Sequence, residues 1–334
     1  MLKPKLSIII PVYNSAPTIL RCLQSIMQTK YINYEIICVD DGSLDDSIQI
    51  IKSIAKSNKR IKILYHNKNK GLYQARITGI KNARGKYIGF VDSDDYVSPQ
   101  FFNKMYNTIK KDKSDIAFAK TVIDAGNVKY IQEKSNEFLT DIKDKDADLI
   151  YEDYWKQAGR CYTWHVVWNK VYSIKLIQDV YDNLLMPDVH LIMMEDFVFS
   201  SIILSKAKKF SYSENCCYYY VQSDETSTST KEVQKIINNL ADINIAFSRV
   251  RIYLEQEELY DRYRLYYREW QMRYSRYWMK KIVDSFMEET DKQLCMNKLK
   301  NVFEVNDCVM PIEDDQVYYE KAIFLTEASE RMLF

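Results

Sequence analysis

The sequence predicts an α/β fold: a mostly parallel, doubly wound sheet in the first part of the chain, followed by a C-terminal region of α-helices. Two observations predict it. Over the first hundred residues, short apolar runs rich in β-branched residues alternate with segments of helical periodicity, and the connections are short. From residue 231 onward, the apolar residues recur only at spacings of three and four, which is typical of packed helices.

Composition and charge restrict the class of protein. At 334 residues the chain has room for one large domain or two. Its 47% hydrophobic and 28% charged residues are ordinary for a globular protein, and its net charge of +1 argues against a dedicated nucleic-acid-binding protein. No apolar run reaches the roughly 18 residues of a membrane span. The seven cysteines are scattered and predict no disulfide framework. We expect a cytoplasmic protein, with peripheral contact at the inner face of a membrane left open.

The expected elements of the first half follow one another in order. Each expected strand is a short apolar run bounded by polar residues or glycine, and the strands are 6–12, 35–39, 61–65 and 86–91. The expected helices between them each have one apolar face, and they are 15–27, 45–57 and 72–83. Downstream we expect a helix at 100–111, a strand at 115–120, further β-structure at 121–131 and an acidic helix at 141–157.

Three of the expected strands end in unusual polar residues: Pro11–Asn14, Asp40–Ser43 and Asp92–Asp95. The carboxyl ends of neighbouring parallel strands meet at one edge of a sheet, so these residues should line one crevice. Clustered carboxylates repel one another and favour a partner such as Mg²⁺ or Mn²⁺. The alternative is a solvated acidic turn before a helix. The glycine-rich fingerprints of dinucleotide and P-loop sites are missing, which disfavours both classes.

The order PVYN, VDDGSLDDS and NKGLYQARITGIKNARGKYIGFVDSDD resembles the nucleotide-sugar-binding half of glycosyltransferase family 2, which has the A-type glycosyltransferase fold. The resemblance is close over residues 5–120 and loose over 120–230. It implies a catalytic domain at 1–230, with a donor half at 1–120 and an acceptor half at 121–230. The helical region at 231–334 would then serve packing or oligomerisation.

The resemblance implies a UDP-sugar site at the first two strand ends. Tyr13 would stack on the base, an interaction worth about 1–3 kcal/mol. Asp41 would accept a hydrogen bond from the N–H of uracil, with capping of the following helix as the alternative. Pro11 would fix the backbone beside the base, and Asn14 would belong to the same nucleotide-sugar-binding loop.

The third motif would complete the donor site. Asp92 would hold the ribose or a metal-bound water, beside Ser93, and Asp94 would bind Mn²⁺ or Mg²⁺ directly while Asp95 supports the loop. Arg76 resembles the family arginine that faces the nucleotide pocket, and a solvated helix arginine is the alternative.

The acceptor half should supply the base. The resemblance resumes at 164–172 and at Glu195-Asp196. These two acids begin an expected helix, and the alternative is that they are there only because the helix dipole favours acids at its N-terminus. The resemblance implies that Asp196 is the catalytic base and that Glu195, Lys170 and Trp168 contact the acceptor or the diphosphate. His165 is expected to be a packed residue. Some family members add a downstream histidine that binds the metal, but residues 218–227 contain none. The metal would then be held by Asp94, diphosphate and water, or Asp224 would take the place of that histidine.

The expected helix at 260–281 carries an aromatic stripe interleaved with arginine and lysine. Its members, spaced 3.5 residues apart on average, are Tyr263, Tyr267, Trp270, Tyr274 and Tyr277. Such a stripe indicates an intrachain core, an oligomer interface or a helix lying on anionic lipid, in that order of preference. We expect a homo-oligomer formed through the C-terminal helices, which also include 292–302 and 318–332.

With these observations beside it, the resemblance implies an inverting, metal-dependent hexosyltransferase. It would move a hexose or N-acetylhexosamine from a UDP-sugar to a hydroxyl of a glycan, glycoprotein or lipid-linked acceptor in cell-surface glycan synthesis. The alternative is a catalytically weak scaffold of the same fold that binds nucleotide and assembles partner enzymes. A nucleotidyltransferase is disfavoured because the glycine-rich phosphate loop of such enzymes is missing.

Overall fold

The computed structural model describes residues 3–131, 139, 141–157, 162–222, 232–285 and 287–303. The strands are β1 (Leu6–Val12), β2 (Tyr34–Asp40), β3 (Ile61–Tyr65), β4 (Tyr87–Phe90), β5 (Tyr96–Val97), β6 (Ile116–Asp124), β7 (Lys129–Ile131), β8 (Lys170–Ser173) and β9 (Phe210–Val221). The helices are α1 (Ile19–Met27), α2 (Ser47–Ser57), α3 (Leu72–Asn82), α4 (Phe101–Asp112), α6 (Ala147–Gln157), α7 (Tyr162–His165), α8 (Ile174–Leu184), α9 (Glu195–Lys206), α10 (Val233–Gln256), α11 (Tyr260–Val283) and α12 (Glu289–Phe303). A 3₁₀ turn spans Ile142–Asp144.

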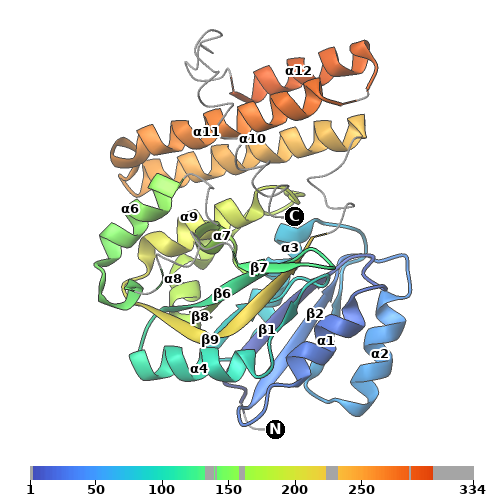
Figure 1. Ribbon diagram of the computed structural model, residues 1–334, viewed down its shortest axis with the longest axis vertical. Helices are drawn as coiled ribbons and strands as arrows, with labels where there is room; N and C mark the ends of the chain where they lie inside the picture. Colours follow the sequence, from blue (N-terminus) through green and yellow to red (C-terminus); the bar gives the residue numbers. More distant parts are fainter. Residues whose placement is uncertain are drawn as a thin grey trace.

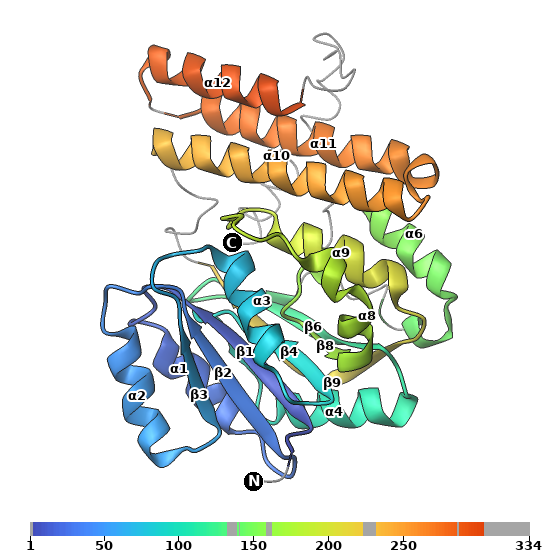
Figure 2. The ribbon, with the colours of Figure 1, turned by 180° about the vertical axis from the view of Figure 1, so that it is seen from behind.

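One sheet runs through the lower part of the molecule, in the order β3-β2-β1-β4-β8-β6-β9-β5, with β7 paired to β6. Helices α1, α2 and α4 cover one face, and α3, α8 and α9 lie on the other (Figures 1 and 2). A layer formed by α10, α11 and α12 lies across one end of the molecule (Figure 1). This arrangement confirms the predicted α/β class with a C-terminal helical region.

The parallel pattern belongs to the first half of the sheet. Strands β3, β2, β1 and β4 are parallel to one another, as predicted. Strand β8 is antiparallel to both β4 and β6, whereas β6 and β9 are parallel. The second half is therefore mixed. The β-structure predicted at 115–131 is present as β6 and β7. Strands β8 and β9 are hard to predict because β8 is short and the apolar pattern of β9 is broken by polar residues in the middle of the strand.

Two predicted helices begin later than expected. The helix predicted from Ser15 begins at Ile19, and the one predicted from residue 45 begins at Ser47. The reason is that the residues before each helix bond across to the other loop. The amide of Ser15 donates to Ser47 Oγ at 2.7 Å, and the amide of Ala16 donates to Asp45 Oδ2 at 2.8 Å. These bonds tie the first two strand ends together. The helix predicted at 318–332 lies outside the described residues.

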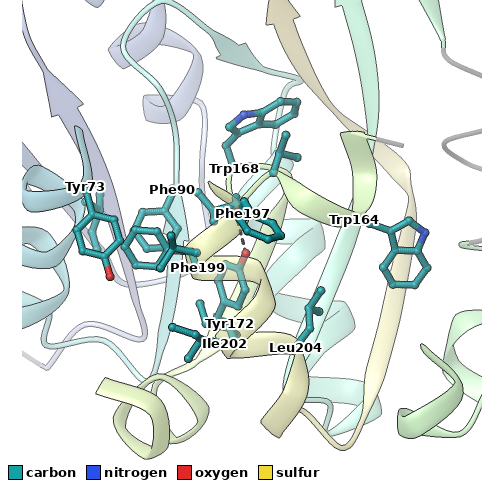
Figure 3. Close-up of a cluster of buried hydrophobic side chains, with 14 of the residues drawn as sticks. Tyr73, Phe90, Trp164, Trp168, Tyr172, Phe197, Phe199, Ile202 and Leu204 are labelled. Atoms are coloured by element: carbon teal, nitrogen blue, oxygen red, sulfur yellow. Dashed lines mark hydrogen bonds between the residues drawn. The ribbon is translucent and has the colours of Figure 1, made fainter. Parts of the chain in front are cut away.

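Helix α9 lies between the sheet and the helical layer. On the sheet side, Phe199 lies beside Tyr73 and Phe90, with ring centroids 4.7 and 6.3 Å apart (Figure 3). On the other side, Phe197 packs on Trp270 of α11 at 4.4 Å. Large buried aromatic side chains gain most of their stabilisation from such burial. The helical layer therefore shares one hydrophobic core with the sheet domain.

The aromatic stripe of α11 is used inside the chain. Tyr263, Tyr267 and Trp270 are buried, and all three pack on Trp155 of α6 at 5.8–6.4 Å between ring centroids. Tyr277, by contrast, is half exposed. The intrachain-core interpretation is therefore confirmed for the first three members. The homo-oligomer stays a prediction that would need another surface. Among the described residues, no helix is both long and apolar enough to cross a membrane.

Candidate active site

The first two strand ends form one connected surface. Val12 of β1 lies opposite Asp40 of β2 in the sheet, so the residues that follow them emerge side by side. Asn14 has a left-handed backbone (φ 48°), and its amide oxygen accepts from the N–H of Leu44 at 2.8 Å. Pro11 is buried within β1, whereas Tyr13 is 47% exposed at the edge of the sheet. Tyr13 therefore presents a ring on which a base can stack.

Asp41 is buried, and it binds the start of α3. Its Oδ1 accepts from the N–H of Lys70 at 2.8 Å and lies 2.6 Å from Nδ1 of His66, and its Oδ2 accepts from the N–H of Gly71 at 2.8 Å. The alternative, in which Asp41 caps α2, is therefore wrong, because the amides that Asp41 binds lie directly before α3. A carboxylate has about four acceptor sites, so Oδ2 retains one for a ligand N–H.

The acidic loop after β4 is anchored to β9. Asp95 is buried and accepts from the hydroxyl of Tyr218 and from the N–H of Val221, both at 2.8 Å. The same Tyr218 hydroxyl accepts from the N–H of Asp92 at 3.0 Å. Burial, followed by the charges of Asp94 and Asp92, raises the pKa of Asp95. The Ser93 hydroxyl lies 2.7 Å from that of Ser15, which joins this loop to the first strand end.

Asp94 lies at the exposed tip of the loop, and its backbone oxygen accepts from Arg21 at 2.6 Å. Partial removal from water, followed by the charge of Asp92, raises the pKa of Asp94 to about 6. Among the described residues no group of three or more metal-binding side chains occurs. A site made from Asp94 and Asp92 alone still suits Mg²⁺ or Mn²⁺, which keep water and phosphate ligands.

Arg76 joins the acidic loop after β4, which we call the donor loop (92–95), to the first turn of α9. Its Nη2 donates to Asp92 Oδ1 at 2.7 Å, and its Nη1 donates to Glu195 Oε1 at 2.7 Å and to Asp196 Oδ1 at 3.2 Å. The arginine side chain is fully buried, so the solvated-arginine alternative is wrong. Two acids 119 and 120 residues further along the chain thus contact the same guanidinium as the donor loop.

The charges around Arg76 do not balance. Three carboxylates, from Asp92, Glu195 and Asp196, contact one guanidinium. Burial raises the pKa values of Glu195 and Asp196, and Arg76 opposes this shift without cancelling it. Burial alone would lower the pKa of Arg76, but the three carboxylates raise it, so Arg76 stays charged. Such a site favours a proton or a further cation beside the guanidinium.

The family model described as Glycosyl transferase family 2 matches residues 7–194. The chain belongs to glycosyl transferase family 2. Glycosyltransferase EpsJ of Bacillus subtilis is 34% identical over 229 residues, which cover 67% of this chain and 63% of that protein. Poly(ribitol-phosphate) beta-glucosyltransferase of Bacillus spizizenii is 33% identical over 222 residues, 65% of this chain and 32% of that protein. The chain thus spans less than two thirds of either relative.

Among solved structures, S. aureus TarS 1–349 in complex with UDP-GlcNAc matches 89% of this chain and 72% of its own, with a TM-score of 0.55 and 20% identity. At that identity the likeness shows the fold alone, and it confirms the predicted fold class. The family 2 resemblance predicted from the three motifs is likewise confirmed.

One family-based expectation needs correction. Lys170 is 1% exposed, and its ammonium donates to the backbone oxygens of Thr163 (2.6 Å) and Val166 and to Asn169 Oδ1 (2.8 Å). It therefore holds the 163–169 segment together and does not contact the acceptor or the diphosphate in this arrangement. A buried ammonium needs such acceptors, which explains its position. Its charge still acts on the Asp196 carboxyl, whose pKa it lowers slightly against the effect of burial.

Trp168 and His165 are also packing residues here. The Trp168 ring is buried and stacks on Tyr218 at 4.2 Å. Its contact with an acceptor or the diphosphate stays a prediction. His165 packs edge-on against Trp270 at 6.3 Å, as expected of a packed residue. The alternative metal ligand Asp224 lies outside the described residues.

Sequence reasoning missed two residues of this site, His66 and Tyr218. His66 follows β3 and bonds to Asp41 with one ring nitrogen, and its other ring nitrogen lies 2.8 Å from the Thr78 hydroxyl. Its position directly after the third strand was the available signal. The Tyr218 hydroxyl bonds to Asp92 and Asp95 of the acidic loop. The available signal for this role was the run Tyr218-Tyr219-Tyr220.

Gly71 allows a close approach between the donor and acceptor halves. It has φ of +90°, and a Cβ there would lie 2.8 Å from the nitrogen and 2.9 Å from the oxygen of Leu191. We expect Gly71→Ala to destabilise the protein by about 3 kcal/mol, because the backbone of Gly71 (φ 90°, ψ 157°) lies in a region essentially restricted to glycine. That conformation costs another residue about 1–3 kcal/mol, and overpacking adds to it. Gly126 has φ of +78° with nothing within 4 Å, so Gly126→Ala should cost only about 1 kcal/mol. Urea unfolding measures both, and equal losses would contradict the close approach.

Proposed function

We propose that the chain is a metal-dependent, inverting glycosyltransferase that uses a UDP-sugar. It would move a hexose or N-acetylhexosamine to a hydroxyl of a glycan, glycoprotein or lipid-linked acceptor in cell-surface glycan synthesis. The observation that carries this proposal is the Arg76 cluster, in which the donor-loop residue Asp92 and the acceptor-half acids Glu195 and Asp196 contact one guanidinium. Family membership and the UDP-GlcNAc bound to the fold neighbour TarS support it.

The nucleotide would lie across the first two strand ends. The exposed ring of Tyr13 would stack on uracil, and the remaining acceptor site on Asp41 Oδ2 would take the uracil N–H. Asp41 is already held by His66, Lys70 and Gly71, so it would accept this bond without rearranging. Such fixed polar groups discriminate well, because a base lacking the N–H would leave the second acceptor site of the buried Oδ2 unfilled.

In the proposed reaction, Asp196 takes the proton of the acceptor hydroxyl. The acceptor oxygen attacks the anomeric carbon from the face opposite the nucleotide, and the bond between that carbon and the diphosphate oxygen breaks. UDP leaves with the electron pair, and the anomeric configuration inverts. The burial that raises the pKa of Asp196 makes its carboxylate a stronger base. Glu195, which shares Nη1 of Arg76 with Asp196, would orient the acceptor.

Asp94 would hold the divalent cation, together with the oxygen of Asp92 that Arg76 leaves free. When bound, the metal would neutralise charge that develops on the departing diphosphate. Asp95, Tyr218 and Ser93 keep the loop in place and need not touch the cation.

The affinity for Mn²⁺ should depend on pH through Asp94. Because the pKa of Asp94 is raised to about 6, the group is largely protonated at pH 5 and ionised at pH 7.5. Only the ionised form binds a metal, so affinity should fall about tenfold for each pH unit below 6 and level off above pH 7. Electron paramagnetic resonance of Mn²⁺ added to the protein alone would measure this. In Asp94→Asn the dependence should vanish, and a wild-type affinity that does not change between pH 5 and 7.5 would contradict the assignment.

A panel of UDP-sugars tests the proposed function. With Mn²⁺ and a hydroxyl acceptor or water, we expect release of UDP from at least one donor, and loss of that release in EDTA. Proton NMR of the product reports whether the anomeric configuration is inverted. The scaffold alternative predicts UDP binding without turnover of any donor. Turnover that persists fully in EDTA would overturn the metal requirement.

A further inference from the structure

The segment 185–194 delivers the acidic pair to the site. It joins α8 to α9 and ends at Met194, directly before Glu195 and Asp196. Met194 has φ of 68° and Asp188 has φ of 63°, so two residues with side chains are left-handed within this one connection. Backbone of this kind persists only where surrounding contacts hold it. Those contacts therefore decide where the catalytic carboxylate points.

One of these contacts comes from the C-terminal helical layer. Asp242, in the middle of α10, is 8% exposed, and its Oδ2 accepts from the N–H groups of Ile192 at 2.8 Å and Met193 at 3.0 Å. Burial raises the pKa of Asp242, and the two N–H donors favour its charged form. Hydrogen bonds to a charged acceptor are roughly twice as strong as neutral ones. Helix α10 lies across the end of α9 in Figure 2.

The opposite side of the segment is held by α3. The N–H of Tyr73 donates to the oxygen of Leu191 at 3.1 Å, and Nε2 of Gln74 donates to the oxygens of Met186 (2.6 Å) and Val189 (3.0 Å). Helix α3 also carries Arg76, which binds the two acids themselves. The segment is thus clamped between α3, which belongs to the donor half, and α10.

We propose that Asp242 is a positioning residue for the Glu195–Asp196 pair, and that α10 is through it a working part of the active site. The two hydrogen bonds fix the backbone N–H groups of the two residues before Met194. They therefore set the direction in which the first turn of α9 begins. This inference rests on the proposed function. It gives the C-terminal helices a role in positioning the acidic pair, beside the assembly role that stays a prediction from their sequence.

Asp242→Ala tests the inference. We expect kcat to fall by about 10²-fold, because a small misplacement of a reacting group costs about that much. The KM for the UDP-sugar and the dissociation constant of UDP should stay within about threefold, since both backbone partners of the Asp242 carboxylate lie in the segment before α9. Hydrogen exchange at Ile192 and Met193 should speed up at least about tenfold. Asp242→Asn keeps an acceptor oxygen and should recover most of the lost kcat.

Glu255→Ala is the matched control. It removes a carboxylate from the same helix, one that pairs with Arg251 on the surface at 2.8 Å, and should leave kcat unchanged. The number of UDP sites per chain, measured in each variant, separates positioning from misfolding. If Asp242→Ala does not fold, Asp242→Asn decides, since loss of the charge must still speed exchange at Ile192 and Met193 and lower kcat measurably.

Two results would overturn the inference while leaving the proposed function intact. One is an unchanged kcat in folded Asp242→Ala. The other is a kcat that falls only in proportion to the UDP sites lost, which would mean a purely structural role. A wild-type chain that turns over no UDP-sugar would instead overturn the proposed function, and this inference with it.

Discussion

Replacing Asp196 by asparagine is expected to lower kcat by about 10²–10⁴-fold while leaving the binding of UDP unchanged. Asparagine has nearly the same shape and keeps an oxygen for Nη1 of Arg76, which lies 3.2 Å from Asp196 Oδ1. It cannot take a proton from the acceptor. The core contacts of α9 through Phe197 and Phe199 should hold the helix in place, so the loss should reflect chemistry.

Glu195→Gln is the comparison that assigns the base. Glu195 contacts the same Nη1 at 2.7 Å, but in our account it orients the acceptor. We expect Glu195→Gln to raise the acceptor KM more than it lowers kcat, the reverse of Asp196→Asn. Steady-state kinetics with the acceptor varied would measure both. If Glu195→Gln loses kcat and Asp196→Asn keeps it, the two roles are exchanged and our assignment is wrong.

Replacing Arg76 by methionine is expected to cost about 3–5 kcal/mol of stability and to abolish turnover. Removing one partner of a buried ion cluster leaves its other charges without compensation, which is the costliest way to break it. Three carboxylates would lose their common donor at once. Arg262→Met is the matched control, because Arg262 is exposed and lies 3.8 and 3.6 Å from its acidic partners. Exposed pairs contribute below about 1 kcal/mol.

The pH dependence of this loss gives a second test. Without Arg76, the pKa values of Glu195 and Asp196 should rise further above their unfolded values, because the guanidinium is what opposes the effect of burial. An acid whose pKa is raised in the folded state lowers the free energy of unfolding at high pH, where it is ionised. This loss disappears at low pH, where the acid is protonated in both states. The loss in Arg76→Met should therefore be larger at pH 8 than at pH 5. Urea unfolding at both pH values would show it, and an equal loss would contradict the proposed charge balance.

Much of the donor half could be predicted because its signals are local. Each buried parallel strand is an apolar run, and its polar end stands next to it in the sequence, as with Asp41 after β2 and Asp92 after β4. The topology rule for parallel sheets then brings those ends together without any side-chain detail. Ser15 shows the limit of this reasoning. The helix predicted from Ser15 begins only at Ile19, and the Ser15 hydroxyl meets that of Ser93, which lies 78 residues away.

The remaining features depend on contacts between distant segments. Nothing around Arg76 in the sequence indicates that it binds acids in α9, and a helix arginine is usually solvated. Lys170 lies in the family-like segment 164–172, but its ammonium is buried and donates to backbone oxygens such as that of Thr163. Only the fold of the 163–169 segment reveals this. The stripe of α11 favours an intrachain core over an oligomer interface or a lipid-facing helix only by preference, and the contact with Trp155 shows that it is a core.

The central claim is that the donor loop and the base meet at Arg76. The most direct measurement is a crystal structure of the chain with UDP and Mn²⁺. We predict the uracil on Tyr13 and Asp41, the cation on Asp94 and the diphosphate beside it, with the Asp196 carboxylate facing the space where the sugar would lie. Nucleotide bound away from the ends of β1, β2 and β4, or a cation that leaves Asp94 untouched, would contradict the account.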